Sequence, residues 1–166
     1  MNNILYTMNK KAILILDNIR SVANVGSIFR TAECFGVSKI ILVGTTPAPV
    51  DRFGRKRKDL AKVALGAEEF VRWEHTVNPK SQTLNLKSKG YKIIALEQHF
   101  KSKKLEVISY ELKAKCFVLI VGNEIDGISK ETLELADEIV EIPMKGKKES
   151  LNVAVATGIA LFELLK

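Results

Sequence analysis

The chain has 166 residues, of which 46% are hydrophobic and 27% are charged. This composition is ordinary for a globular protein and argues against intrinsic disorder. A domain of this length can bury roughly 70% of its unfolded surface, so a single domain is predicted over residues 1–166. The net charge of +7 permits a polyanionic partner but specifies no chemistry.

Features that the sequence lacks narrow the class of protein further. The longest apolar run, residues 153–162, is shorter than the roughly 18 residues that a membrane-spanning helix needs, so no membrane association is expected. No signal peptide is recognisable at the amino terminus. Cys34 and Cys116 lack metal-ligand spacing and stand in runs that look buried, so we expect reduced core residues of a cytoplasmic protein. His75 and His99 stand far apart, and no metal is expected.

The first half of the chain alternates apolar runs with helical patterns. Residues 12–16 (AILIL) predict a buried strand. From Asn24, apolar residues recur at spacings of three and four up to Phe35, which predicts a helix that ends at Gly36. The other elements predicted in this half are a strand at 39–43, a proline-containing loop at 45–51, a helix at 60–65 and a short edge strand at 69–73.

The second half repeats this alternation, and its strands are continuous apolar runs. The predicted elements are a helix at 81–89, strands at 93–96 and 117–121, a helix at 130–136, a strand at 138–142 and a helix at 151–165. Strands that are apolar on both faces are typical of a parallel sheet covered by helices on both sides. The sequence therefore predicts an α/β fold with a mainly parallel sheet. Ligands of such sheets bind at the carboxyl ends of the strands.

The C-terminal helix pattern is apolar on nearly every side. Such a helix must be buried on most sides. Ser150 stands at its expected start, beside a loop that carries Lys145, Lys147 and Lys148. A polar side chain at this position can cap the helix or meet a ligand. Taken alone, this stretch favours Ser150 as the N-cap of the helix over a role in ligand binding.

Two polar motifs occur earlier in the chain. Residues 24–32 (NVGSIFRTA) place Gly26 at a helix start, where backbone can approach a neighbour closely, and Arg30 about two turns beyond Asn24. Residues 122–129 (GNEIDGIS) follow a buried strand and set two carboxylates between two glycines. Arg30 alone reads as an exposed helix residue, and the second motif alone reads as a turn with Ser129 capping the next helix.

Positive charge is densest in one short segment before the helix predicted at 60–65. Clustered Lys and Arg residues suit contacts with the phosphates of a polyanion, although an ordinary solvated surface is the alternative for such a loop taken singly. The candidate phosphate-binding residues of this segment are Arg52, Arg55, Lys56, Arg57 and Lys58.

Together, in order and spacing, three motifs are far more specific. N-x-G-x-I-x-R-T-A from Asn24, G-N-E-x-x-G from Gly122 and I-P-M-x-G-x-x-x-S-L-N-V from Ile142 resemble those of the SpoU/TrmH family of RNA ribose 2′-O-methyltransferases, in the SPOUT superfamily. The resemblance runs from about Ala12 to Leu165. It implies an α/β fold with a C-terminal trefoil knot, a homodimer, and S-adenosylmethionine bound in the knot. In such a dimer, Ala154 and Gly158 on the last helix would let another helix come close.

The resemblance also assigns residues to roles. Arg30 matches the family's catalytic arginine, and we expect it to stabilise the developing alkoxide and clamp a phosphate, because a guanidinium rarely loses a proton. The other expected catalytic positions are Asn24, Glu124, Ser150 and Asn152. The expected cofactor-binding residues are Leu96, Gly122, Ile142, Met144, Ser150 and Leu151.

The substrate implied by the resemblance is RNA, with tRNA favoured over rRNA. Three alternatives are weaker. A non-catalytic RNA-binding or ribosome-assembly protein on the same fold need not keep Arg30 or the cofactor loops, and a base methyltransferase of the superfamily usually lacks this set of motif residues. A nucleotide-binding module of another class would need a phosphate-binding fingerprint that is absent here.

Overall fold

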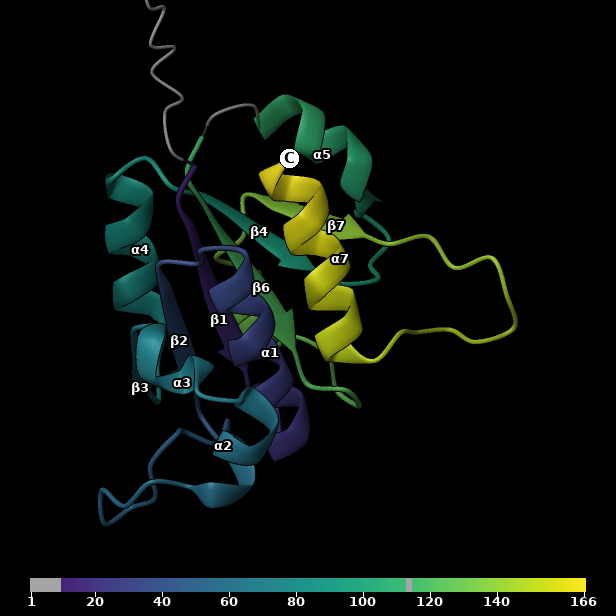
Figure 1. Cartoon of the computed structure of the whole chain (residues 1–166). Coiled ribbons are helices and arrows are strands. Elements are labelled where there is room, and N and C mark those ends of the chain that lie inside the picture. The colour runs from purple at the N-terminus through teal and green to yellow at the C-terminus, as the bar shows by residue number, and fades with distance from the viewer. Residues whose placement is uncertain (1–9, 113–114) are drawn as a thin grey trace, which may run out of the picture.

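A computed structural model of the chain describes residues 10–112 and 115–166; residues 1–9 and 113–114 of the predicted domain lie outside the described part. The described residues form a seven-stranded sheet with the order β3-β2-β1-β6-β4-β7-β5, in which every neighbouring pair is parallel (Figure 1). The predicted parallel α/β sheet is confirmed. The strands are β1 Ala12–Asp17, β2 Lys39–Val43, β3 Trp73–Thr76, β4 Lys92–Leu96, β5 Lys103–Lys104, β6 Phe117–Gly122 and β7 Glu138–Glu141.

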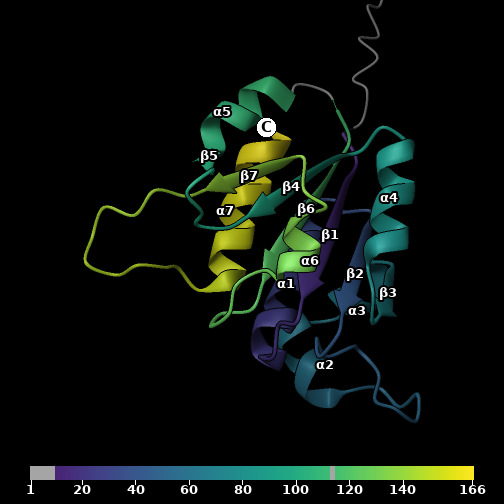
Figure 2. The same cartoon turned by 180° about the vertical axis from the view of Figure 1, so that it is seen from behind.

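Helices cover both faces of this sheet, as predicted. They are α1 Val22–Cys34, α2 Lys58–Ala64, α3 Ala67–Phe70, α4 Lys80–Ser88, α5 Leu105–Leu112, α6 Lys130–Leu133 and α7 Val153–Leu165. Successive side chains of β1 point to opposite faces: Leu14 joins a core with α1, α2, α5 and α7, whereas Ile15 joins a second core beside α4 and α6. Figure 2 shows α4 and α6 on the face opposite α7.

Two regions differ from the sequence prediction. The strand expected at 69–73 begins only at Trp73, because α3 occupies the preceding residues after Gly66, which has a left-handed φ of 90°. The short β5 and the helix α5 were not predicted. Two exposed lysines form β5, so no apolar pattern marks it, and β7 is the only strand that it pairs with in residues 10–112 and 115–166.

The helix α7 is buried on most sides, as predicted, but not on all of them. Val155, Ile159 and Phe162 are exposed on one side of it, whereas its other apolar side chains are buried or half-buried. The small residue Gly158 faces Thr31 of α1, and a Cβ added to it would lie 3.7 Å from that side chain. Asn152, and not Ser150, is the N-cap residue.

Other surface features also correct the sequence prediction or extend it. Cys34 is exposed and Cys116 is half-buried, so neither is the core residue that was expected. Cys34 is the last residue of α1, and Cys116 directly precedes β6. Among the described residues, no helix is long and apolar enough to cross a membrane.

Candidate active site

A chain of hydrogen bonds joins the three sequence motifs. The amide of Asn24, in the first turn of α1, donates to Glu124 Oε1 at 2.6 Å, and its oxygen accepts from Asn152 Nδ2 at 3.0 Å. The oxygen of Asn152 in turn accepts from the backbone N–H of Ala154 at 2.9 Å and so caps α7. Residues from α1, from the loop after β6 and from the start of α7 therefore meet at one point.

A cavity of about 370 Å³ lies beside this meeting point. It opens at the carboxyl ends of β4, β6 and β7, the edge where parallel sheets bind ligands, and Glu124 is part of its wall. Three further carboxylates, of Glu97, Glu141 and Glu149, also line it and were not predicted. All six residues expected to bind the cofactor line the cavity: Leu96, Gly122, Ile142, Met144, Ser150 and Leu151.

The structure explains why both positions of the second motif, 122 and 127, are glycines. A Cβ at Gly122 would overlap the backbone of Gly127 and Ile128, because the loop folds back over the end of β6. Gly127 has a left-handed φ of 71° and leaves room for the carboxylate of Glu97, which accepts from the N–H of Ile128 at 2.9 Å. These contacts hold the loop that presents Glu124.

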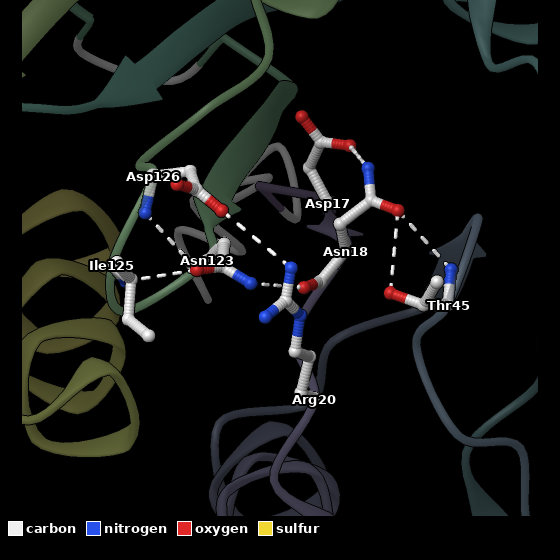
Figure 3. Close-up of polar contacts among 7 residues, drawn as sticks. All are labelled: Asp17, Asn18, Arg20, Thr45, Asn123, Ile125 and Asp126. Atoms are coloured by element: carbon white, nitrogen blue, oxygen red, sulfur yellow. Dashed lines mark hydrogen bonds and ion pairs between the residues drawn. The ribbon is translucent and has the colours of Figure 1, made fainter.

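A polar network with Asp17 and Asn123 buried in it lies under the motifs and was missed by sequence reasoning (Figure 3). Asp17, which is 1% exposed, accepts from the N–H and the hydroxyl of Ser129 at 2.8 Å each. Asn18 donates to Asp17 at 2.9 Å, and its side-chain oxygen accepts from the N–H of Thr45 at 3.1 Å. The side chain of Asn123 donates to the carbonyl of Asn18 at 2.8 Å. The network ties together the carboxyl ends of β1, β2 and β6.

One side chain of this network shapes the second motif directly. The oxygen of Asn123 accepts from the N–H groups of Ile125 at 2.8 Å and Asp126 at 3.1 Å, so it closes the turn that contains Glu124. Beside it, the exposed pair of Arg20 and Asp126 is 3.6 Å apart. The position of Asn123 directly after a buried strand was the available sequence signal, because strand ends are where such sites form.

Arg30 and Ser150 lie differently from the other motif residues. Arg30 is six residues, or about 9 Å along the helix axis, beyond Asn24, and its side chain is exposed. It is absent from both the described cavity wall and the hydrogen-bond chain. Ser150 is exposed and lines the cavity without capping α7. The structure thus brings Asn24, Glu124 and Asn152 together with the expected cofactor-binding loops. Arg30 neither lines the cavity nor hydrogen-bonds to these three side chains in the described residues.

The basic segment is partly neutralised by neighbouring carboxylates. Arg55 pairs with Asp51 at 2.8 Å, Lys56 with Glu69 and Glu68, and Arg57 with Asp59 at 2.7 Å. The hydrogen bond to Glu69 raises the pKa of Lys56, and the one to Asp59 raises the pKa of Arg57. Within the described residues, the candidate RNA-binding cations without an ion pair are Arg52 and Lys58.

Comparison with known proteins identifies relatives of this chain. The model of the SpoU rRNA Methylase family matches residues 11–162. The tRNA (guanosine(18)-2′-O)-methyltransferase of Aquifex aeolicus is 33% identical over 163 residues, which are 98% of this chain and 72% of that protein. The 23S rRNA (guanosine-2′-O-)-methyltransferase of Ralstonia nicotianae is 32% identical over 93% of this chain and 58% of its own length.

Solved structures agree with these relatives. The AdoMet-bound rRNA methyltransferase from Sinorhizobium meliloti superposes with a TM-score of 0.81 at 32% identity, over 93% of this chain and 55% of that one. The TrmH/SpoU tRNA modifying enzyme of A. aeolicus superposes with a TM-score of 0.79 at 31% identity, over 96% of this chain and 77% of that one. The chain therefore spans from about half to three quarters of the length of these proteins, and its fold, its motifs and the family match together show that it belongs to the SpoU rRNA methylase family.

Proposed function

We propose that this protein transfers a methyl group from S-adenosylmethionine to a ribose 2′-hydroxyl of RNA. The observation that carries the proposal is the hydrogen-bonded meeting of Glu124, Asn24 and Asn152 at the rim of a cavity formed by strand ends. Relatives named as tRNA and 23S rRNA 2′-O-methyltransferases support it. The AdoMet-bound relative from S. meliloti supports the choice of methyl donor.

The cavity suits S-adenosylmethionine in size and chemistry. Its volume of about 370 Å³ lies in the range of roughly 300–1,000 Å³ that is usual for small-molecule sites. Leu96, Ile142 and Leu151 offer apolar walls for an adenine ring. The carboxylates of Glu97 and Glu124 are complementary to a ligand that carries a sulfonium and an ammonium group. The residues present therefore fit the proposed cofactor.

In this proposal the residues of the chain bind the methyl donor, orient the ribose and exclude water. When bound, S-adenosylmethionine supplies an electrophilic methyl group. The loops 96–98, 122–127 and 142–151 would enclose it and keep water from its reactive carbon. Asn24 and Asn152 hold Glu124 in one orientation, which positions the rim of the cavity toward an incoming ribose.

Arg30 has a separate role in the proposal. Its side chain is exposed on α1 and outside the cavity wall, so it acts on the RNA. A guanidinium retains its proton at neutral pH, so it stabilises negative charge on the 2′-oxygen and on the adjacent phosphate rather than accepting a proton. The proton of the 2′-hydroxyl would leave to the phosphate or to water.

The substrate and the assembly are finer parts of the same proposal. Relatives of this chain are named as tRNA enzymes and as 23S rRNA enzymes. We favour tRNA because residues 61–74 resemble the corresponding segment of tRNA-directed members of the family. The exposed apolar side of α7 supports a homodimer. A trefoil knot in the C-terminal part is compatible with β7 lying outside β4 while α7 packs back beside α1.

The proposal predicts separable effects on cofactor binding and methyl transfer. The wild-type protein should bind S-adenosylmethionine in calorimetry and incorporate labelled methyl groups into bulk tRNA at ribose 2′-oxygens. Arg30→Ala should bind the cofactor with unchanged affinity while its methylation rate falls by about 100-fold or more, because one electrostatic stabiliser of a developing oxyanion contributes about that factor.

Arg72→Ala is the matched control. Arg72 is also an exposed arginine, but it precedes β3 at the opposite edge of the sheet, so its loss should leave methylation unchanged. Near-normal turnover of Arg30→Ala would refute the role of that residue. Absence of cofactor binding by the wild-type protein would refute the enzyme and favour the non-catalytic RNA-binding alternative. Mapping ribose-methylated nucleotides in cells that lack the protein would decide between tRNA and rRNA.

A further inference from the structure

The segment between β2 and α2 contains a small hairpin that presents an aromatic ring. Val50 and Lys56 form an antiparallel bridge, and the N–H of Arg57 donates to the carbonyl of Pro49 at 2.9 Å. The N–H of Asp51 donates to the carbonyl of Arg55 at 2.8 Å. We refer to residues 49–57 as the basic hairpin. In Figure 1 the loop that contains it projects from the molecule below α2.

Hydrogen bonds of one side chain hold the tip of the basic hairpin. The carboxylate of Asp51 accepts from the N–H groups of Phe53 at 2.8 Å and Arg55 at 3.0 Å. Gly54 takes a left-handed φ of 77°, which other residues adopt at a cost, and its N–H donates to the carbonyl of Asp51 at 2.9 Å. The hydrogen bond from the Arg55 backbone lowers the pKa of Asp51, so its carboxylate keeps these bonds at neutral pH. The tip is therefore preorganised.

This tip displays a phenyl ring beside two guanidinium groups. Phe53 is 65% exposed. The guanidinium carbons of Arg52 and Arg55 lie 4.7 and 5.0 Å from its ring centroid, within cation–π distance. Aromatic rings and guanidinium planes are the two protein groups on which unpaired nucleobases stack. Together the three side chains form one exposed stacking surface that also carries positive charge.

The remaining cations of the segment have a different task. Lys56 at the base of the hairpin is held by Glu69 and by the buried Glu68, so it anchors the hairpin to α3. Arg52 and Lys58 have no ion pair among the described residues. Their charges are therefore the ones most available for contacts with RNA phosphates. A site of this composition binds through stacking as well as through charge.

The hairpin lies on the edge of the sheet where the cavity opens. It follows β2, whose carboxyl end is in register with that of β1, and β1 is in register with β6 at Gly122. Gly26 permits α2 to pack closely on α1, since a Cβ there would lie 2.9 Å from Val63 Cβ and 3.1 Å from the carbonyl of Leu60. One RNA strand running along this edge can therefore contact both the hairpin and the cavity rim.

We propose that Phe53, flanked by Arg52 and Arg55, is a stacking site for an unpaired nucleobase of the RNA substrate, away from the methylated nucleotide. This inference rests on the proposed function, because it presumes that RNA is the substrate. Its consequence is that the protein recognises a single-stranded or looped region beside its target. Duplex RNA, whose bases are already stacked on one another, contacts only the charges of the hairpin.

The test compares Phe53→Leu with the wild-type protein on a short single-stranded RNA that carries one 2-aminopurine, and on a blunt duplex of the same sequence. Leucine keeps an apolar side chain but removes the π face. We expect affinity for the single strand to fall by about 5- to 100-fold, the range for one stacked base, with loss of 2-aminopurine quenching and no change on the duplex. Phe53→Trp should restore both the affinity and the quenching.

Two further variants separate stacking from charge and from general surface effects. Phe53→Leu should leave the salt slope of binding unchanged, whereas Arg52→Gln should reduce it by about 0.7, the value for one phosphate contact on a single strand. Phe70→Leu removes another exposed phenylalanine, on α3, for which no cation–π pair is found among the described residues. It should behave like the wild-type protein.

The outcomes distinguish this inference from the proposed function. Wild-type affinity and quenching in Phe53→Leu, or an equal loss in Phe70→Leu, would overturn the stacking site while methylation by the wild-type protein still supported the enzyme. An equal loss on single-stranded and duplex RNA would also overturn it. A wild-type protein that binds neither RNA would overturn both. Circular dichroism and thermal melting of each variant confirm that the fold is intact.

Discussion

At the scale of single residues, Asn24 is the side chain that links the motifs. Its amide donates to Glu124, and its oxygen accepts from Asn152, so both ends of the amide are used and the side chain has one orientation. Sequence motifs predicted that these residues belong together, because the order and spacing of three separate motifs matched a family. The direction of each hydrogen bond could not be predicted, since it depends on side-chain rotamers that only packing decides.

The polarity of this chain of hydrogen bonds predicts the effect of Asn24→Asp. The variant places a second carboxylate against Glu124, where the wild-type protein has a donor at 2.6 Å. Two carboxylates at such a distance repel each other unless they share a proton. We expect the free energy of unfolding to fall by about 1–2 kcal/mol at neutral pH, and the deficit to shrink as the pH is lowered and the proton is taken up.

Urea unfolding at neutral and mildly acidic pH measures this difference. Asn24→Ala is the control, because it removes the same hydrogen bonds without adding charge, and its deficit relative to the wild-type protein should not depend on pH in this way. A deficit of Asn24→Asp that is equal at both pH values would contradict the orientation assigned to the amide.

At the scale of elements, buried strands were predictable and their polar supports were not. The strand β2 has the predicted bounds. Its half-buried Lys39 is followed by four buried apolar residues, and so short an apolar run between turn residues is typical of a buried strand. The helix α5 escaped prediction although Leu105, Ile108 and Leu112 are buried at helical spacing. Three side chains at that spacing are also compatible with a surface segment, and only the neighbouring α7 makes it a core element.

Asp137 shows how one carboxylate can support three elements. It accepts from the N–H of Ile93 at 2.8 Å in β4 and pairs with Lys87 of α4 at 2.9 Å, just before β7 begins. Burial alone would raise the pKa of Asp137, but the hydrogen bond from Ile93 and the pair with Lys87 outweigh it and hold that pKa below its ordinary value.

We therefore expect Asp137→Ala to destabilise the fold by about 2 kcal/mol, and Asp137→Asn by about 1 kcal/mol because the amide oxygen still accepts. A lowered folded-state pKa gives stability that is present above the unfolded value of about 3.9 and is lost as the pH falls through the folded value. The difference between the wild-type protein and Asp137→Asn should accordingly begin to shrink as the pH falls below about 4, and should vanish only below the lowered folded-state pKa of Asp137. Thermal unfolding followed across this pH range checks the prediction, and a difference that persists in acid would contradict the ionic contribution.

At the scale of the whole molecule, the outer side of α7 is the feature that a single chain leaves unexplained. Val155, Ile159 and Phe162 are 52%, 41% and 63% exposed, and they lie at helical spacing on one side. The sequence predicted an apolar helix but could not show which of its sides the rest of the chain covers. The structure shows that α1, α5 and the sheet cover the other sides of α7, which leaves this one for the proposed second subunit.

Ile159→Glu should therefore convert a dimer into a monomer, because two glutamates and their shells of water would be forced into an apolar interface. Light scattering or sedimentation gives the molecular mass directly. Val77→Glu is the matched control, since Val77 is 86% exposed in the loop after β3 and far from α7 in the sheet order. A wild-type protein that is already monomeric, or an unchanged mass of Ile159→Glu, would contradict the proposed assembly.

The central place of β1 has a consequence for the synthesis of the chain. One edge of this strand pairs with β2, which follows it closely in the chain. The other edge pairs with β6, with Ala12 opposite Phe117, and β6 is synthesised much later. Until β6 has been synthesised, the nascent polypeptide therefore exposes the unpaired backbone N–H and C=O groups along this edge of a mostly apolar strand. Unpaired edges of this kind recruit wrong partners. Truncation products that end before residue 117 should accordingly precipitate or remain bound to chaperones rather than fold.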